Sequence, residues 1–174
     1  MKQLMRGVLT GAGLGAVMLT ASLAAQGPVR VEIKDAQGQS IGTASLSEMS
    51  GMVHIQLDVK GLKPGEHALH VHMTPKCEGP AFTSAGGHFN PAGKKHGLQS
   101  AEGPHAGDME NFMVQADGTS KAMVMAKGIS LGTGANSVFA NGGTALVIHA
   151  GPDDMKTDPA GAAGDRIACG VITK

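Results

Sequence analysis

The stretch Val53-His54-Ile55-Gln56-Leu57-Asp58-Val59-Lys60 alternates apolar and polar side chains over its whole length. Successive side chains of an extended chain point to opposite faces, so this period of two predicts a β-strand rather than a helix. The apolar face is expected to point into a core. The other face, which carries His54, Gln56, Asp58 and Lys60, is expected to point outward. The stretch therefore predicts a half-buried strand.

Short apolar or alternating segments recur on both sides of this stretch. Further strands are expected near residues 29–34, 67–73, 111–116, 121–126, 144–149 and 166–172. Turn residues separate several of them, and Asp117-Gly118 is a hairpin signal because this pair tolerates the positive φ of tight turns. No convincing amphipathic helix follows the N-terminal segment. About eight short strands with Gly-rich turns predict an all-β fold, an antiparallel sandwich or barrel.

Two long segments, about 74–110 and 150–165, do not have the pattern of strands. Long irregular segments in a compact domain are usually functional. Most of the candidate ligands described below lie in or beside these two segments.

The composition of the 174-residue chain is that of one domain with a core and many turns. It has 27 glycines, no Trp or Tyr, and fourteen basic against fourteen acidic residues. There is no basic run or basic helix face, so nothing points to nucleic-acid binding.

The first two dozen residues have the pattern of a secretory signal peptide. Lys2 and Arg6 precede an apolar stretch over residues 8–24, and Ser22-Leu23-Ala24 offers small residues at a cleavage site. We expect a signal peptide over residues 1–24, with cleavage after Ala24, and one domain over residues 25–174. An uncleaved anchor is the alternative, but the stretch is short and broken by glycines, so no stable membrane anchor is expected. The product would be periplasmic or otherwise exported.

Six of the eight histidines fall into one spaced pattern with an aspartate. Neutral imidazole is the commonest biological metal ligand. Seven ligands are one fewer than two four-coordinate metals need, so one ligand must be shared or one metal must stay incomplete. The candidates are His70, His72, His88, His96, His105, Asp108 and His149.

The spacing of these residues favours two kinds of site. On a strand, period two puts His70 and His72 on one face, and with His149 and one further nitrogen they would suit Cu(II). His88, His96, His105 and Asp108 form a good tetrahedral zinc set. Both sets need His88, whose two ring nitrogens could bridge two metals. An outward polar face for the histidine pair, and a purely structural role for His149, remain open on these grounds.

Cys77 and Cys169 are the only cysteines. In an exported protein an even count indicates a disulfide, with one possible intramolecular connection here. Closing a loop of this length would stabilise the fold by about 4–5 kcal/mol at most, from chain entropy. Thiols serving as extra metal ligands are the alternative, disfavoured by the absence of a C-x-x-C spacing.

Five blocks of the sequence resemble the copper/zinc superoxide dismutases in order and spacing, over essentially the whole mature chain. They are Leu69-His70-Val71-His72, Gly87-His88-Phe89-Asn90-Pro91, His105-Ala106-Gly107-Asp108-Met109, Val147-Ile148-His149-Ala150-Gly151 and Gly164-Asp165-Arg166-Ile167-Ala168-Cys169-Gly170-Val171-Ile172. The resemblance implies an eight-stranded antiparallel Greek-key β-sandwich or barrel, immunoglobulin-like, with two long functional loops.

The resemblance also implies the ligand sets, with one copper and one zinc ion per subunit. His70, His72, His88 and His149 would bind copper. His88, His96, His105 and Asp108 would bind zinc, with His88 as a bridging imidazolate. These assignments give the shared ligand that the count of seven requires.

Other roles follow from the same resemblance. Arg166 would attract and orient superoxide beside the copper, Asp153 would link His70 to His96, and Cys77 and Cys169 would form the family's intrasubunit disulfide. The expected activity is dismutation of superoxide to dioxygen and hydrogen peroxide, for antioxidant defence of the cell envelope. A homodimer is possible, but the sequence does not assign the oligomeric state.

One departure concerns the final loop, in which Lys156 is the only lysine. Electrostatic guidance of superoxide is therefore expected to be weaker or to come from elsewhere. A copper-delivering protein without turnover is a second reading of the chain, but it would be favoured only by loss of a copper ligand or of Arg166. A purely structural zinc domain would leave His70, His72, His149 and Arg166 unexplained.

The eleven methionines raise a separate question, because thioethers bind Cu(I). Met123 and Met125 share one face of a predicted strand and are expected to pack, since methionine commonly fills gaps in cores. A methionine copper-loading site is the alternative. His54, outward on its own strand, has no assigned role.

Overall fold

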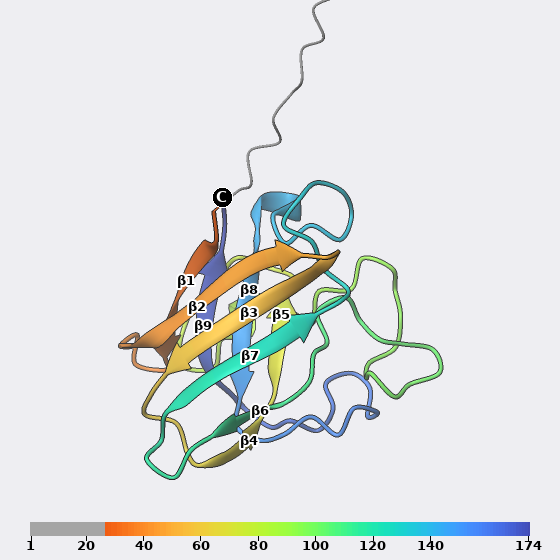
Figure 1. Ribbon diagram of the computed structural model, residues 1–174. Coiled ribbons are helices and arrows are strands. Elements are labelled where there is room, and N and C mark those ends of the chain that lie inside the picture. Colours follow the sequence, from red (N-terminus) through yellow and green to blue (C-terminus); the bar gives the residue numbers. More distant parts are fainter. Residues whose placement is uncertain (1–26) are drawn as a thin grey trace, which may run out of the picture.

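The computed structural model describes residues 27–174, and these fold into β-strands joined by long loops and two short 3-10 turns (Figure 1). The expected signal peptide and its cleavage after Ala24 lie outside the described residues. The strands are β1 (Val29–Asp35), β2 (Ser40–Met49), β3 (Met52–Val59), β4 (Gly65–His67), β5 (Leu69–His72), β6 (Phe112–Val114), β7 (Ser120–Ala126), β8 (Thr144–His149) and β9 (Arg166–Ile172). The turns are η1 (Thr83–Ala85) and η2 (Ala140–Gly142).

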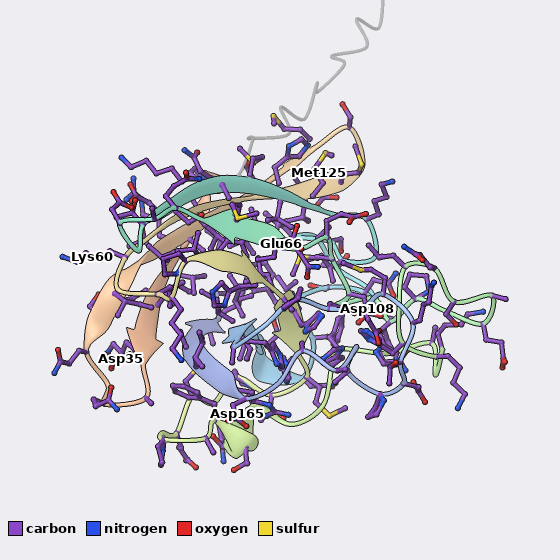
Figure 2. The ribbon with its side chains drawn as sticks, turned by 90° about the horizontal axis from the view of Figure 1, so that it is seen from below. Asp35, Lys60, Glu66, Asp108, Met125 and Asp165 are labelled. Atoms are coloured by element: carbon purple, nitrogen blue, oxygen red, sulfur yellow. A yellow bond between two sulfur atoms is a disulfide. The ribbon has the colours of Figure 1, made fainter. Side chains whose placement is uncertain are left out.

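Seven strands form one sheet in the order β5-β8-β9-β1-β2-β3-β7, and β4 pairs with β6. Every ladder between named strands is antiparallel. The sheet curls around a common interior, as seen along the strands in Figure 2. The expected all-β antiparallel architecture is confirmed.

The core lies inside this curled sheet, because each strand turns its apolar side chains the same way. In β3, Val53, Ile55 and Leu57 are fully buried while His54 and Gln56 point outward. The strand predicted from the alternation at 53–60 is confirmed, and its register places Leu57 opposite Ala44 of β2 and Ala122 of β7.

The strands differ from the sequence prediction in two details. The described part of the chain has nine strands, because the predicted segments do not include β2 and the predicted strand 67–73 divides into β4 and β5 at Ala68. The Asp117-Gly118 turn forms, with Gly118 at φ 80°, but it does not close a two-stranded hairpin. The strands on its two sides pair elsewhere, β6 with β4 and β7 with β3.

The two long loops lie at one side of the sheet, and a disulfide ties the first of them to β9. Cys77 and Cys169 are bonded, with their Cα atoms 5.6 Å apart. Around this bond, Phe82 and Ala85 of the loop pack with Ala145 of β8 in a small second core. The predicted disulfide is confirmed, and the alternative of thiol ligands is excluded.

The methionines of β7 do not pack as expected. Met123 and Met125 are 57% and 50% exposed, because Val124 and Ala126 occupy the inward positions of the strand.

Within residues 27–174, no helix has the length and apolar character needed to cross a membrane.

Candidate metal centre

The six patterned histidines and their aspartate converge in one buried region between β5, β8 and the two long loops. Their candidate ligand atoms fall into three groups, and within each group all atoms lie within 4.8 Å of one another. The groups are His70, His72, His88 and His149; His88, His96, His105 and Asp108; and His70, His96 and Asp153.

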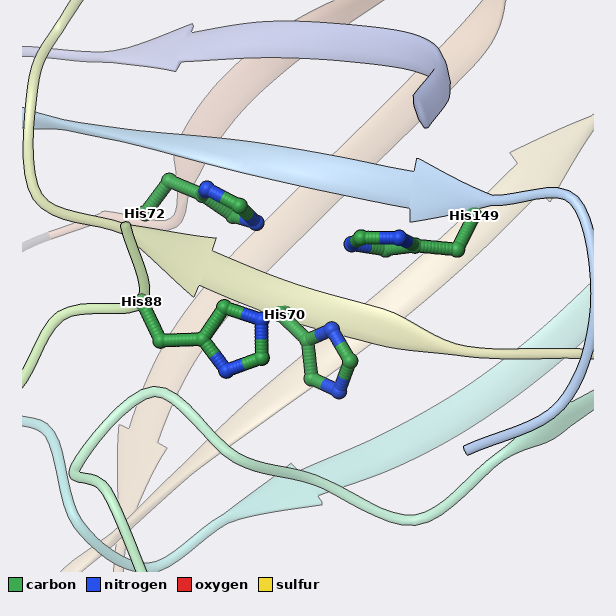
Figure 3. A group of neighbouring side chains, drawn as sticks. All are labelled: His70, His72, His88 and His149. Atoms are coloured by element: carbon green, nitrogen blue, oxygen red, sulfur yellow. The ribbon is translucent and has the colours of Figure 1, made fainter. Parts of the chain in front are cut away.

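The first group is made by two strands and one loop (Figure 3). His70 and His72 lie on β5, on the same face as predicted, and His149 ends the neighbouring strand β8. His88 reaches them from the first long loop, because a bridge pairs its backbone with that of His72. This geometry does not fit the two alternatives that the sequence left open. One was an outward polar face for His70 and His72, and the other was a purely structural role for His149.

Each histidine of the first group keeps one buried ring nitrogen without a hydrogen-bond partner. These atoms are His70 Nδ1, His72 Nε2, His88 Nε2 and His149 Nε2. Buried polar atoms in native proteins nearly always have a partner, so four unpartnered nitrogens whose positions converge indicate a metal-binding site. Four imidazole nitrogens are a donor set that suits copper.

The opposite ring nitrogens are held by the backbone. His72 Nδ1–H donates to the Gly86 carbonyl at 2.9 Å, and His149 Nδ1–H donates to the Gly164 carbonyl at 3.2 Å. These bonds select the tautomer that leaves Nε2 free to bind a metal. Burial lowers the pKa of His72 to about 2 and of His149 to about 4, so both rings stay neutral.

The second group surrounds Asp108 Oδ1. His88 Nδ1 lies 2.9 Å from this oxygen, His96 Nδ1 3.1 Å and His105 Nδ1 3.3 Å. The Nδ1 atoms of His88 and His105 are 3.4 Å apart. In a tetrahedral zinc site the ligand atoms are about 3.3 Å from one another, given Zn–N and Zn–O bonds near 2.0 Å. The donors of the second group therefore fit zinc.

The second group is electrostatically distinct from the first. Burial opposes charge at His96, but its close contacts with the Asp108 and Asp153 carboxylates outweigh burial and raise the pKa of His96 to about 9. Burial also raises the pKa of Asp108, yet contacts with His88 and His96 hold it well below its ordinary value. Backbone N–H groups of Gly97 and His105 donate to Asp108 Oδ2 and fix the carboxylate.

Asp153 joins the two groups. Its Oδ2 lies 2.8 Å from His70 Nε2 and its Oδ1 lies 3.0 Å from His96 Nε2. Asn111 holds the Asp153 backbone through two hydrogen bonds, one in each direction. Gly161 leaves room for the carboxylate, because a Cβ at that position would lie 1.8 Å from Asp153 Oδ1.

Arg166 lies at the edge of the first group. It is paired with His149 across β8 and β9, and its Nη1–H donates to the Phe82 carbonyl at 2.8 Å. The guanidinium is partly exposed while the histidines are buried. The positive charge of Arg166 lies near enough to this group to contribute to the lowered pKa values of His72 and His149.

Several residues that shape the centre carry no signal in the sequence. Asn111 and Gly161 support Asp153 from loops, and Asp158 Oδ1 accepts from the His96 backbone N–H at 2.9 Å. His67, unlike these residues, is expected from the family resemblance to be a structural histidine and not a ligand, and its two ring nitrogens join the Lys63 and His149 carbonyls. Apart from the contact of His67 with Lys63, four residues away, these contacts join segments that only the folded chain brings together.

Comparison with known proteins points to one family. A family model described as copper/zinc superoxide dismutase matches residues 40–172. Superoxide dismutase (Cu-Zn) 2 of Aquifex aeolicus (strain VF5) is 49% identical over 168 residues, which are 95% of this chain and 96% of that protein.

Solved structures show the same fold. A crystal structure of a SOD-like protein from Bacillus subtilis has a TM-score of 0.79 at 33% identity, covering 82% of this chain and 97% of that one. The Cu/Zn superoxide dismutase from Brucella abortus has a TM-score of 0.69 at 29% identity, covering 83% and 99%.

Proposed function

The chain belongs to the copper/zinc superoxide dismutase family, whose members are oxidoreductases with one copper and one zinc ion per subunit, and from this premise we propose which residues carry the reaction. His70, His72, His88 and His149 hold copper. His88, His96, His105 and Asp108 hold zinc. The copper assignment rests on the four buried ring nitrogens that lie close together and have no hydrogen-bond partner.

When bound, copper supplies one-electron redox chemistry in both directions, which lets one centre oxidise one superoxide to dioxygen and reduce another to hydrogen peroxide, while zinc supplies charge without redox. The protein would supply four imidazole nitrogens for this chemistry, those of His70, His72, His88 and His149. Burial holds the pKa values of His72 and His149 low, so no proton competes at their Nε2 atoms near neutral pH.

His88 is the shared ligand, because its Nε2 belongs to the first donor group and its Nδ1 to the second. With both metals bound, His88 would be an imidazolate; its Nε2 would take up a proton from solvent and pass it on to the reduced substrate. The contact of Nδ1 with Asp108 in the zinc set keeps the ring in place while that proton moves.

Arg166 attracts and orients the anion. A guanidinium fixed by the Phe82 carbonyl presents positive charge at the approach to the buried nitrogens. Charge focused in this way raises the rate at which a small anion reaches a site. Asp153 acts on the ligands instead of the substrate, since it holds the rings of His70 and His96 in their binding orientations.

The proposed place of action is the cell envelope, where an exported enzyme would remove superoxide. A disulfide between Cys77 and Cys169 is typical of an oxidising compartment. Fractionation of cells expressing the full chain, followed by N-terminal sequencing, tests this proposal. We expect an exported protein that begins at Ala25. A cytoplasmic protein that keeps residues 1–24 would contradict it.

A copper-delivering protein without turnover is the competing function. It requires neither Arg166 nor a complete zinc set, and this chain has both. A purely structural zinc domain requires only the second donor group.

A superoxide-consumption assay on the metal-loaded protein separates these functions. The wild type is expected to show cyanide-sensitive activity, His72→Ala to lose it with its copper, and Arg166→Ala to be slowed about tenfold or more at low salt. Arg30→Ala, which removes an exposed arginine of β1, is the matched control and should keep the full rate. An inactive copper-loaded wild type would exclude the enzymatic function, and an unimpaired Arg166→Ala would exclude anion guidance.

A further inference from the structure

Methionines dominate the exposed apolar surface of the described chain. Six large apolar side chains in residues 27–174 are widely exposed, and five of them are methionines. No leucine, isoleucine or phenylalanine is among them. They are Met49, Met73, Met113, Met123 and Met125, with Val171 as the sixth. Leucine, isoleucine or phenylalanine would provide apolar surface as well as methionine does. What distinguishes the five methionines from these residues is the thioether group.

Three of these methionines gather on the outer face of β2, β3 and β7 together with Met52 and His54. The ladder registers place Met125 directly opposite His54 and Met49 directly opposite Met52. Met123 lies opposite Gln56, diagonal to His54. We call this set, Met49, Met52, His54, Met123 and Met125, the methionine patch.

His54 is the centre of the methionine patch. Directly opposite residues of antiparallel strands have Cβ atoms about 5 Å apart, and residues two apart on one strand share a face. Met125 is therefore beside His54 on β7, and Met52 is beside it on β3. A methionine side chain has three rotatable bonds, so both sulfurs can turn toward the imidazole without a change in the backbone.

We propose that the methionine patch binds one Cu(I) ion through the thioethers of Met52 and Met125 and the imidazole of His54. Thioether sulfur is a soft ligand that selects Cu(I) over Zn²⁺, and imidazole suits copper in either oxidation state. Met49 and Met123 flank this set and offer further sulfurs. The five-residue patch thus places one imidazole among four thioethers, a set of donors that Cu(I) can bind.

This site is separate from the buried metal centre. His70 and His72 are fully buried, whereas Met125 is half exposed on the outer side of β7. Figure 2 shows Met125 at the rim of the molecule, apart from Asp108 of the buried centre. The inference goes beyond the proposed function, because Cu(I) binding on the outside of the sheet does not require turnover.

The test is an anaerobic titration of the copper- and zinc-loaded protein with Cu(I) against a chromophoric Cu(I) chelator. The wild type is expected to bind one Cu(I) equivalent beyond its resident copper. Met52→Leu/Met125→Leu and His54→Gln are expected to lose that equivalent. Leucine keeps nearly the same volume on an outward face, so these variants should fold and keep the wild-type dismutase rate.

Met73→Leu/Met113→Leu is the matched control, because it removes two equally exposed methionines outside the patch. It should keep the extra equivalent. The proposal is overturned if the wild type takes up no extra Cu(I), or if the control loses as much as the patch variants. It is also overturned if the methionine patch proves to be a dimer interface instead. In that case sedimentation would show a wild-type dimer that binds no extra Cu(I), and the patch variants would be monomers. Dismutase activity is measured separately, so failure of the surface site leaves the proposed enzymatic function intact.

Discussion

Asp153 Oδ2 lies 2.8 Å from His70 Nε2, and both side chains are fully buried. The same carboxylate reaches His96 with its other oxygen, so one residue orients a ligand in each donor group. The contacts with His70 and His96, together with the Met155 backbone N–H, hold the pKa of Asp153 well below its ordinary value although burial raises it. Asp153 is thus a charged link between the copper-type and zinc-type sets.

Replacing Asp153 with alanine should weaken metal binding more than it weakens the fold. Loss of a carboxylate that orients metal-binding histidines typically costs roughly 10–100-fold in affinity. Zinc affinity measured by chelator competition should fall by this amount. Asp58→Ala removes an exposed carboxylate paired with Lys121 and is the control. Equal zinc affinities in the two variants would contradict the role of Asp153.

Gly161→Ala should have nearly the same effect without replacing a ligand, because the added Cβ would crowd both Asp153 and the His96 ring. The added Cβ would meet Asp153 Oδ1 at 1.8 Å, and the backbone at Gly161 has φ 65°, which L side chains rarely adopt. Zinc affinity should fall and the melting temperature of the metal-free protein should decrease. Gly151→Ala in the same loop is the control, because its Cβ would meet only Ala163 O at 3.6 Å. Identical behaviour of the two variants would refute the steric argument.

Zinc binding to the metal-free protein should depend on pH through His96. Its pKa is raised from 6.5 to about 9, so at neutral pH zinc must displace a proton. Between pH 9 and pH 7, apparent zinc affinity should fall roughly tenfold per pH unit, measured by titration calorimetry in buffers of different ionisation enthalpy. A flat affinity profile with no proton release would show that His96 is neutral.

The raised pKa of His96 also makes the stability of the metal-free fold depend on pH. A group whose pKa is higher in the folded than in the unfolded state stabilises the fold below its unfolded value. In the metal-free protein this contribution is complete below pH 6.5 and is lost as the pH rises through about 9. Urea unfolding of the metal-free protein at pH 7 and at pH 9.5 should show the decrease, and His96→Gln should remove the difference.

Removing the disulfide should affect both stability and substrate capture. Cys77 and Cys169 are 92 residues apart, and loss of their bond should destabilise the fold by about 4–5 kcal/mol at most. The bond also ties down the loop whose Phe82 carbonyl accepts from Arg166. Cys77→Ser/Cys169→Ser should therefore lower the melting temperature, and kcat/KM should fall while metal content is kept. A full rate at low salt would show that Arg166 is positioned without the loop.

Much of the fold follows from local pattern. The alternation over residues 53–60 predicts the β3 strand, and period two predicts that His70 and His72 share a face, because side-chain direction along a strand is a property of the pleated backbone. β2 was not delineated by the pattern. Gly42 interrupts its alternation where the ladder with β1 is irregular, and its outward positions are mostly small residues.

The two donor sets could be predicted from the sequence only in part. The residue types and their order indicate two metals and a shared His88, and the resemblance to a family assigns them. Which ring nitrogen of His72 or His149 stays free depends on the Gly86 and Gly164 carbonyls, which come from loops. Contacts between distant segments depend on loop paths, and no local period encodes them.

The sequence by itself therefore determined the all-β class, the kinds of ligand and the one possible cysteine pairing, because these depend on residue type and on backbone periodicity. Tertiary structure alone decided that Asp153 reaches both donor groups and that Gly161 must lack a side chain. It also decided that Met123 and Met125 face solvent beside His54, since the register between β3 and β7 sets which side chains become neighbours. These side chains come from segments that are far apart in the sequence, and only the folded chain brings them together.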